Sequence, residues 1–296
     1  MHPDDVPVDE RLVHALLRTQ APRWAELPLR RVDQIGTDNV LFRLGSDLVV
    51  RLPRGGRSAL SLAKECEWLP RLRRHLPVAI PEVRAVGRPA EGYRFPWAVY
   101  GWLDGDRATE ERVADPRRLA DELAALISAL RRLDAADAPR PGQHNFFRGV
   151  PLRERDRETR TAIAALAGRL DTAAAAAAWE DALAAPAWTS APVWIHGDLD
   201  RQNLLVDGHG RLAGVIDFGG LGAGDPACDV MAGWKLFDGA DRAAFGHALG
   251  VDEPTWRRSR GWIVSQAVMA LAYYTDETHP VLVSESRRWL AAVVGS

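Results

Sequence analysis

An α+β fold in two lobes is predicted by two features of this sequence of 296 residues. β-type residues bounded by turn signals gather in the first third of the chain. Further on the apolar spacing is mainly helical, with a few short apolar segments between the helices. The length also allows two separate cores. We therefore expect a small N-terminal lobe at residues 1–103, made of an antiparallel sheet and one major helix, and a larger, mainly helical lobe at residues 104–296.

The N-terminal lobe is expected to begin with a helix and to continue into strands. Leu12, Leu16 and Leu17 recur at helical spacing, and Pro22 ends that segment. β-type residues follow, and a turn signal at residues 45–47 separates two runs of them. The expected elements are a helix at 9–20, two or three antiparallel strands within 29–53, a helix at 59–75, and strands at 82–87 and 96–103.

The second lobe is expected to begin with a strong helix. Asp115 suits the N-cap, Pro116 suits the first helical position, and leucines recur on one face after them. A stretch rich in Pro and Gly at residues 139–149 indicates a loop. The expected elements are helices at 115–135, 153–169 and 172–184, strands at 193–195, 204–206 and 213–216, and helices over most of 226–295.

Composition excludes several classes of function. The formal net charge of −2 provides no electrostatic footprint for nucleic acid or for an anionic membrane. No apolar run approaches the length of a membrane span. The acidic N-terminus is unlike a signal peptide, and Cys66 and Cys228 fit neither a disulfide framework nor a zinc cluster. We expect a cytoplasmic protein, and the sequence leaves its oligomeric state open.

The most informative motif is His196-Gly197-Asp198, followed by Asn203 and by Asp217-Phe218-Gly219. Four residues separate Asp198 from Asn203, as in the catalytic loop of kinases. Phosphoryl transfer needs a carboxylate that takes the proton of the acceptor hydroxyl, and Asp198 is the candidate. It also needs hard oxygen ligands for magnesium, which Asn203 and Asp217 supply. We expect His196 to brace the loop by hydrogen bonding.

Each of these residues has a structural alternative when it is taken alone. Asp198 suits a turn, Asn203 a helix cap and Asp217 a strand end. The spacing of all three beside apolar strands favours a phosphotransferase site. A metal hydrolase is the main chemical competitor, but it lacks a second nearby histidine, since His209 lies in a turn-rich linker. An Arg or Tyr between the histidine and the aspartate would mark a protein kinase, and here Gly197 occupies that position.

The sequence resembles the aminoglycoside phosphotransferase family over residues 25–275. That family is related to choline and macrolide kinases and has a protein-kinase-like fold, and the resemblance implies the same fold here. The segment from Trp194 to Val230 carries the specific part of it. The matching motifs are His196-Gly197-Asp198, Asn203, Ile216-Asp217-Phe218, Gly224-Asp225-Pro226-Ala227-Cys228-Asp229 and, upstream, Gly36-Thr37-Asp38-Asn39, Val49-Val50-Arg51-Leu52, Lys64-Glu65 and Pro96-Trp97-Ala98-Val99-Tyr100.

The resemblance implies ATP and Mg²⁺ as cofactors and assigns a role to several residues. Asp198 is the base, Asn203 and Asp217 are the magnesium ligands, and Glu65 pairs with a basic residue on the strand at 48–52. Arg51 stands where kinases have a phosphate-binding lysine, with a fork in place of a point charge. The expected contacts with the nucleotide are the Thr37 hydroxyl at the phosphates and the hinge from Tyr100 through Trp102 to Leu103 at the adenine. For Asp225 and Asp229 we favour a structural role, as a helix cap and a loop brace.

The expected acceptor is the hydroxyl of a small molecule, foremost an aminoglycoside-type antibiotic. Such polycations call for acidic pockets, and the candidate carboxylates in the second lobe are those of Asp200, Asp238, Asp241, Asp276 and Glu277, with Asp200, Asp276 and Glu277 foremost. Large aromatic residues in the second lobe equally suit a macrolide or another bulky alcohol, or simply the core. A further alternative is a catalytically weak nucleotide-binding protein on the same fold, which Arg51 and the single glycine of the 36–39 turn allow.

Overall fold

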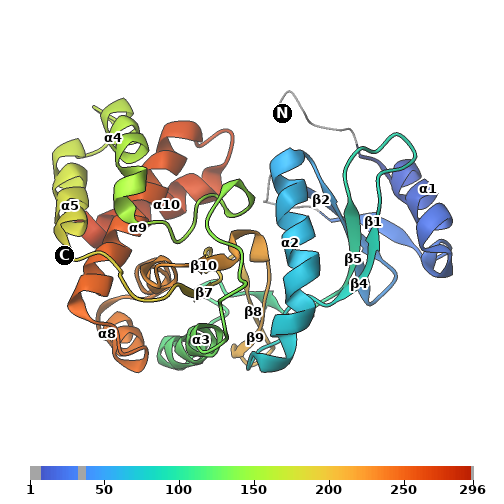
Figure 1. Cartoon of the computed structure of the whole chain (residues 1–296), viewed down its shortest axis with the longest axis horizontal. Coiled ribbons are helices and arrows are strands. Elements are labelled where there is room, and N and C mark those ends of the chain that lie inside the picture. Colours follow the sequence, from blue (N-terminus) through green and yellow to red (C-terminus); the bar gives the residue numbers. More distant parts are fainter. Residues whose placement is uncertain (1–7, 33–37, 295–296) are drawn as a thin grey trace.

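The computed structural model describes residues 8–32 and 38–294 and contains an antiparallel sheet at one end and a helical region at the other (Figure 1). The sheet has the strand order β1-β2-β3-β5-β4, and every neighbouring pair is antiparallel. Its strands are β1 (Leu29–Arg31), β2 (Asn39–Leu44), β3 (Leu48–Pro53), β4 (Val83–Gly87) and β5 (Trp97–Gly101). The predicted α+β fold class, with strands first and helices later, is confirmed.

Two helices cover the two faces of this sheet. α1 (Glu10–Gln20) buries Val13, Leu16 and Leu17 in one apolar cluster with alternate residues of β2 and β3. Side chains alternate along a strand, so Arg51 of β3 points to the opposite face, where α2 (Gly56–Leu72) lies between the sheet and the helical region (Figure 1). α2 starts three residues before the predicted span, with the extended Gly55 at its N-cap, and a 3₁₀ turn at Arg73–His75 continues it to the predicted end.

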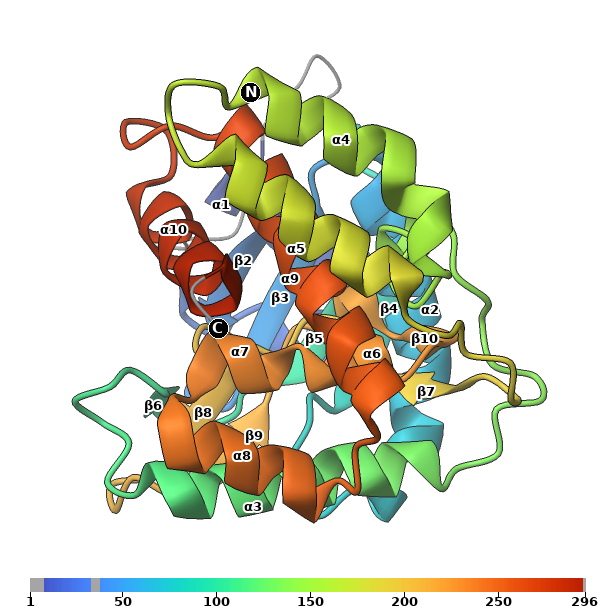
Figure 2. The same ribbon diagram turned by 90° about the vertical axis from the view of Figure 1, so that its left-hand side faces the viewer.

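The helical region is built around α9 (Glu253–Tyr273). α4 (Asp156–Ala165), α5 (Thr172–Ala184) and α10 (Pro280–Val294) pack against α9. At the other end α3 (Pro116–Arg131) packs against α8 (Gly239–Ala248) (Figure 2). Two short helices, α6 (Ala227–Val230) and α7 (Ala232–Leu236), complete the region. None of the helices in the described ranges is long and apolar enough to span a membrane.

Short strands inside the helical region position the predicted catalytic residues. β7 (Val193–Ile195) pairs with β10 (Gly222–Gly224) and leads directly into His196. The β8 (Leu204–Val206) and β9 (Leu212–Val215) hairpin follows Asn203 and precedes Asp217, and β6 (Asp106–Arg107) pairs with β8. Because Leu204 pairs with Val215, the hairpin brings Asn203 and Asp217 to the same end.

The predicted elements are present, with differences at their ends. The helix predicted at 115–135 ends at Arg131, and the one predicted at 153–169 covers only 156–165, because a 3₁₀ turn precedes it and Gly168 adopts a φ of +77° after it. One buried cluster joins residues from both sides of the predicted lobe boundary, including Leu62 and Tyr100 with Leu123 and Leu204. The predicted boundary between two lobes at residue 103 therefore stays a prediction.

Candidate active site

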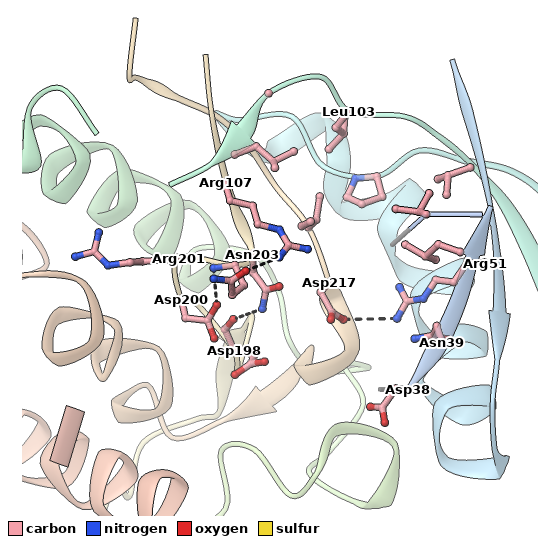
Figure 3. Close-up of a pocket in the computed structure, with 18 of the residues that line it drawn as sticks. Asp38, Asn39, Arg51, Leu103, Arg107, Asp198, Asp200, Arg201, Asn203 and Asp217 are labelled. Carbon is pink, nitrogen blue, oxygen red and sulfur yellow. Dashed lines mark hydrogen bonds and ion pairs between the residues drawn. The ribbon is translucent and has the colours of Figure 1, made fainter. Parts of the chain in front are cut away.

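A cavity of about 540 Å³ lies between the sheet and the helical region. It is lined by β2, β3 and β5, the segment after β5, the loop after β7, and α10. Of the residues singled out from the sequence, those that line it are Arg51, Tyr100, Trp102, Asp198, Asp200, Asn203 and Asp217. Figure 3 shows Asp198, Asn203 and Asp217 projecting into this space opposite Arg51. Thr37 lies outside the described residues.

A buried carboxylate holds the catalytic loop in place. Asp229, which is 1% exposed, accepts hydrogen bonds from the backbone N–H groups of His196 at 2.8 Å and Gly197 at 2.7 Å. Asp225 accepts from the Ala227 N–H at 2.9 Å and forms a buried ion pair with Arg258 at 2.7 Å. The two aspartates act as the loop brace and helix cap that the sequence indicates.

Gly197 is required by the close approach of two loops. Its φ of +83° lies in the left-handed region, and a Cβ atom there would stand 2.5 Å from the carbonyl oxygen of Gly220. Gly220 follows the Asp217-Phe218-Gly219 turn, so this contact ties the catalytic loop to the loop of the second predicted metal ligand. A side chain of any kind between His196 and Asp198 would separate the two loops.

His196 braces the loop rather than transferring a proton. It is fully buried, and burial lowers the pKa of its imidazole. Its Nδ1 atom accepts from the Asp198 N–H at 3.3 Å, so Nε2 carries the proton and donates to the Ile216 carbonyl at 3.2 Å. Phe218 packs on the ring at a centroid distance of 4.5 Å. Both ring nitrogens are engaged, which leaves His196 no nitrogen for the metal of a hydrolase.

Asp198 is poised to accept a proton from a molecule in the cavity. Burial raises the pKa of its carboxyl, but Lys235 and then Arg148 outweigh that effect and hold it below the usual range. The Lys235 ammonium lies 3.5 Å and the Arg148 guanidinium 3.7 Å from Oδ1. The carboxylate is 36% exposed to the cavity. It is therefore ionised at neutral pH and accessible, as a base or an orienting group must be.

Asn203 and Asp217 present oxygen atoms that suit magnesium. Asn203 donates from Nδ2 to the Asp198 carbonyl at 2.9 Å, which leaves its amide oxygen as the remaining polar atom. Asp217 adopts a left-handed φ of +60°, and its carboxylate is 52% exposed. An amide oxygen and a carboxylate are hard ligands, and Mg²⁺ in nucleotide sites takes one or two protein carboxylates and completes its shell with phosphates and water. The donor set thus fits the ion.

The expected ion pair of Glu65 with a basic residue of the third strand is present. The Arg51 guanidinium lies 2.7 Å from Glu65 Oε2 and 3.5 Å from Asp217 Oδ1. With its amide oxygen facing the guanidinium, Asn39 accepts from Arg51 at 3.0 and 3.1 Å. Glu65 is fully buried behind Arg51, so it orients Arg51 and does not itself line the cavity. Arg51 is the cation that the sheet presents between Glu65 and Asp217.

Comparison with models of protein families shows which family this chain belongs to. The family model described as the phosphotransferase enzyme family matches residues 30–262, which include the whole constellation. The chain belongs to the phosphotransferase enzyme family. Comparison with curated proteins gives no significant sequence match.

Solved structures of other phosphotransferases share the fold. A GDP complex of a mutant aminoglycoside 2'-phosphotransferase-IIIa matches with a TM-score of 0.75 and 20% identity over 96% of this chain and 98% of that one. The macrolide 2'-phosphotransferase MphH from Brachybacterium faecium matches with a TM-score of 0.61 and 22% identity over 94% and 98%. A streptomycin–ATP complex of APH(2")-IIa matches with a TM-score of 0.60 and 18% identity over 98% and 99%.

The hinge of this phosphotransferase differs in one detail from the expectation. Tyr100 is 3% exposed, and its hydroxyl lies 3.6 Å from Cys66 Sγ. The Trp102 N–H donates to the Asp47 carbonyl at 2.7 Å, so this amide is not free for the adenine contact that was expected of the hinge. The Trp102 ring stacks with Arg43 at 3.9 Å. Trp102 therefore acts as a wall of the cavity.

The acidic residues expected at the acceptor site are only partly there. Asp200 lines the cavity, but its carboxylate lies 3.8 Å from the Lys235 ammonium. Burial raises the pKa of Asp200 to about 6. Asp276 and Glu277 are exposed on the segment before α10 and do not line the cavity. Asp276 instead forms a bidentate ion pair, at 2.9 and 2.8 Å, with Arg287 of α10.

Sequence reasoning gave no role to four polar residues of the site. Asn39 and Lys64 stood only as parts of the matching motifs, and Arg148 lies in the loop rich in Pro and Gly, without a distinctive motif. Lys64 on α2 donates to the Gly219 carbonyl at 2.7 Å and to the His144 carbonyl at 3.2 Å, which links α2 to the loop after Asp217. Lys235 contacts Asp198 from α7. The sequence did contain one signal for Lys64 and Lys235. They are the two lysines of the chain, and the rest of its 38 lysines and arginines are arginines.

Proposed function

We propose that the protein transfers the γ-phosphoryl group of ATP to a hydroxyl group of a small molecule. The observation that carries this proposal is the convergence of Asp198, Asn203, Asp217 and Arg51 on one cavity. The four side chains come from three segments: the loop between β7 and β8, the end of β9, and β3. A base, two oxygen ligands and a cation for phosphate together serve positioning and charge neutralisation, which dominate catalysis of phosphoryl transfer.

The residues divide the chemistry between them. Asp198 accepts the proton of the acceptor hydroxyl while that oxygen attacks the γ-phosphorus. The bond between the γ-phosphorus and the bridging oxygen breaks, and ADP leaves with its electron pair. Mg²⁺, held by Asn203 and Asp217, would neutralise charge on the phosphate oxygens when it is bound with the nucleotide. Arg51 contributes a fixed positive charge to the phosphates, and Glu65 keeps its guanidinium oriented.

An aminoglycoside is the first candidate for the acceptor. Structural neighbours of this chain include complexes of aminoglycoside phosphotransferases with kanamycin, streptomycin and gentamicin. Their identity to this chain is 18–20%, so they support the reaction more than the particular acceptor. Among the carboxylates that the sequence singled out for a cationic substrate, Asp200 lines the cavity.

A macrolide or another bulky alcohol is the second candidate, and the apolar α10 side of the cavity supports it. Asp200 already has Lys235 as its partner, and Glu285 lies 2.6 Å from Arg288. The α10 side of the cavity adds Leu282 and Trp289 as apolar wall. A polycation would have to compete with Lys235 and Arg288 for these carboxylates, whereas an uncharged body would pack against the apolar wall.

Turnover with a panel of acceptors tests the proposal. The purified protein is incubated with Mg·ATP or Mg·GTP and with aminoglycosides, macrolides or amino sugars. Nucleoside diphosphate release is followed, and mass spectrometry checks that the acceptor gains one phosphoryl group. We expect acceptor-dependent release that the Asp198→Ala variant loses while its thermal unfolding stays that of a folded protein. Nucleotide binding without turnover on any acceptor, or equal turnover by Asp198→Ala, would refute the proposal and favour a binding protein.

A further inference from the structure

Lys235 is an unusual residue of this chain by composition and by place. Of 38 lysines and arginines, only Lys64 and Lys235 are lysines, and both are buried. Lys235 lies on α7, and its side chain is 1% exposed. Lysine contributes a compact point charge, whereas arginine, the more usual residue of buried ion pairs, brings a planar guanidinium fork. Its burial beneath the cavity therefore calls for a specific explanation.

The ammonium of Lys235 is enclosed by the loop after β7 and by α10. Its Nζ atom lies 3.5 Å from Asp198 Oδ1 and 3.8 Å from Asp200 Oδ2. Trp289 of α10 covers it, with the ring centroid 4.5 Å away. The Lys235 carbonyl accepts from Arg288 at 2.6 Å, which fastens α7 to α10. The ammonium is thus held at a fixed place beside the carboxylate that we assign as the base.

The two cations near Asp198 engage the same oxygen. Lys235 and Arg148 both approach Oδ1, at 3.5 and 3.7 Å. Among residues 8–32 and 38–294, no hydrogen bond or ion pair is formed by Oδ2. One oxygen is therefore anchored, and the other is left for a molecule in the cavity. Such an arrangement selects one rotation of the carboxylate.

We propose that Lys235 is a positioning residue of phosphoryl transfer, which holds Oδ1 of Asp198 so that Oδ2 meets the acceptor hydroxyl. The proposal rests on the proposed function and adds a residue to it. Asp200 serves as the second anchor that keeps the ammonium in place. The competing explanation is that Lys235 only neutralises the buried Asp200, in which case the two are dispensable together.

A double variant separates these explanations. Lys235→Met alone leaves Asp200 buried without its partner, so it also lowers stability. Asp200→Asn/Lys235→Met removes both charges and recovers the thermal stability. We expect its kcat to stay about 100-fold below wild type, since a misplaced reacting group costs a factor of that order. The KM for ATP and the Kd for Mg·ADP should stay within about twofold. Arg117→Met, on an exposed part of α3, controls for a lost positive charge.

The outcomes are distinguishable from failure of the proposed function. If Asp198→Ala abolishes turnover but the double variant keeps a kcat within about threefold of wild type, Lys235 is only a neutralising partner and our inference is wrong. If the wild type shows no turnover that depends on Asp198, with any alcohol or with water as acceptor, the proposed function itself fails. Crystal structures then decide the inference: we expect the Asp198 carboxylate to rotate in the double variant, and an unchanged rotamer overturns the proposal.

Discussion

Replacing Arg51 by methionine removes the cation of the sheet that pairs with Glu65 and lies 3.5 Å from Asp217. Glu65 is fully buried, its Oε2 atom lies 2.7 Å from Arg51, and its Oε1 atom has no hydrogen-bond partner among the described residues. Arg51→Met thus leaves a buried, unpaired carboxylate. Breaking a buried pair from one side destabilises a protein by about 3–5 kcal/mol, and we expect a loss of that order in the free energy of unfolding.

The same substitution should weaken nucleotide binding through a separate effect. If Arg51 contacts the phosphates, the variant loses at least one charge-assisted hydrogen bond, worth about 1.5–3 kcal/mol. Since about 1.4 kcal/mol corresponds to a tenfold change, the Kd for Mg·ATP should rise by roughly 10- to 150-fold. The effect on stability acts through Glu65, and the effect on binding acts through the phosphates.

Arg51→Met/Glu65→Met separates the two effects. Removing both charges leaves no unpaired carboxylate, so the double variant should regain stability to within roughly 1 kcal/mol of wild type. Its affinity for nucleotide should stay as low as that of the single variant. Stability is measured by denaturant unfolding and affinity by titration calorimetry at pH 7. Wild-type affinity in the double variant would show that Arg51 is only the partner of Glu65 and that another group holds the phosphates.

Three further outcomes follow from the site. Asp217→Ala should weaken nucleotide binding only in the presence of Mg²⁺, and calorimetry with and without the ion would contradict its ligand role if the affinity were unchanged. Gly197→Ala should destabilise the protein by about 1–3 kcal/mol, because its Cβ would meet Gly220 at a strained φ; a Tm equal to wild type would argue against the loop contact. Burial lowers the pKa of Lys64 to about 8, while the unfolded chain keeps that proton to about pH 10.5, so the unfolded state binds more protons between these values. The unfolding free energy of wild type minus that of Lys64→Met should therefore rise from pH 8 to 10, and a flat or falling difference in denaturant titrations would refute the assignment.

The elements of this fold could be predicted well because their signals are local. Alternating apolar residues in β2 and β3 and the leucines of α1 and α3 specify which face is buried, whatever the partner. Ends were predicted less well, because capping by Gly55 or a 3₁₀ turn depends on a few residues with weak preferences.

The sequence by itself was enough to predict that the residues proposed as base and metal ligands lie together. Asp198, Asn203 and Asp217 each stand at the end of a short apolar strand, and the β8–β9 hairpin must bring the last two together. Their relation follows from chain connectivity over about twenty residues, so spacing is enough to predict it. The ion pair of Arg51 and Glu65, which the family resemblance implied, is also close in sequence, because β3 leads directly into α2.

Only the tertiary structure decided which charges meet across distant segments. Lys235 reaches Asp198 and Asp200 from α7, and Lys64 reaches the loop after Asp217 from α2. In the same way Asp276 turned out to be paired with Arg287 outside the cavity. No local pattern predicts these pairs, because whether two charges meet depends on how helices pack. Electrostatic energy depends on distance and burial, and both are set by packing rather than by spacing along the chain.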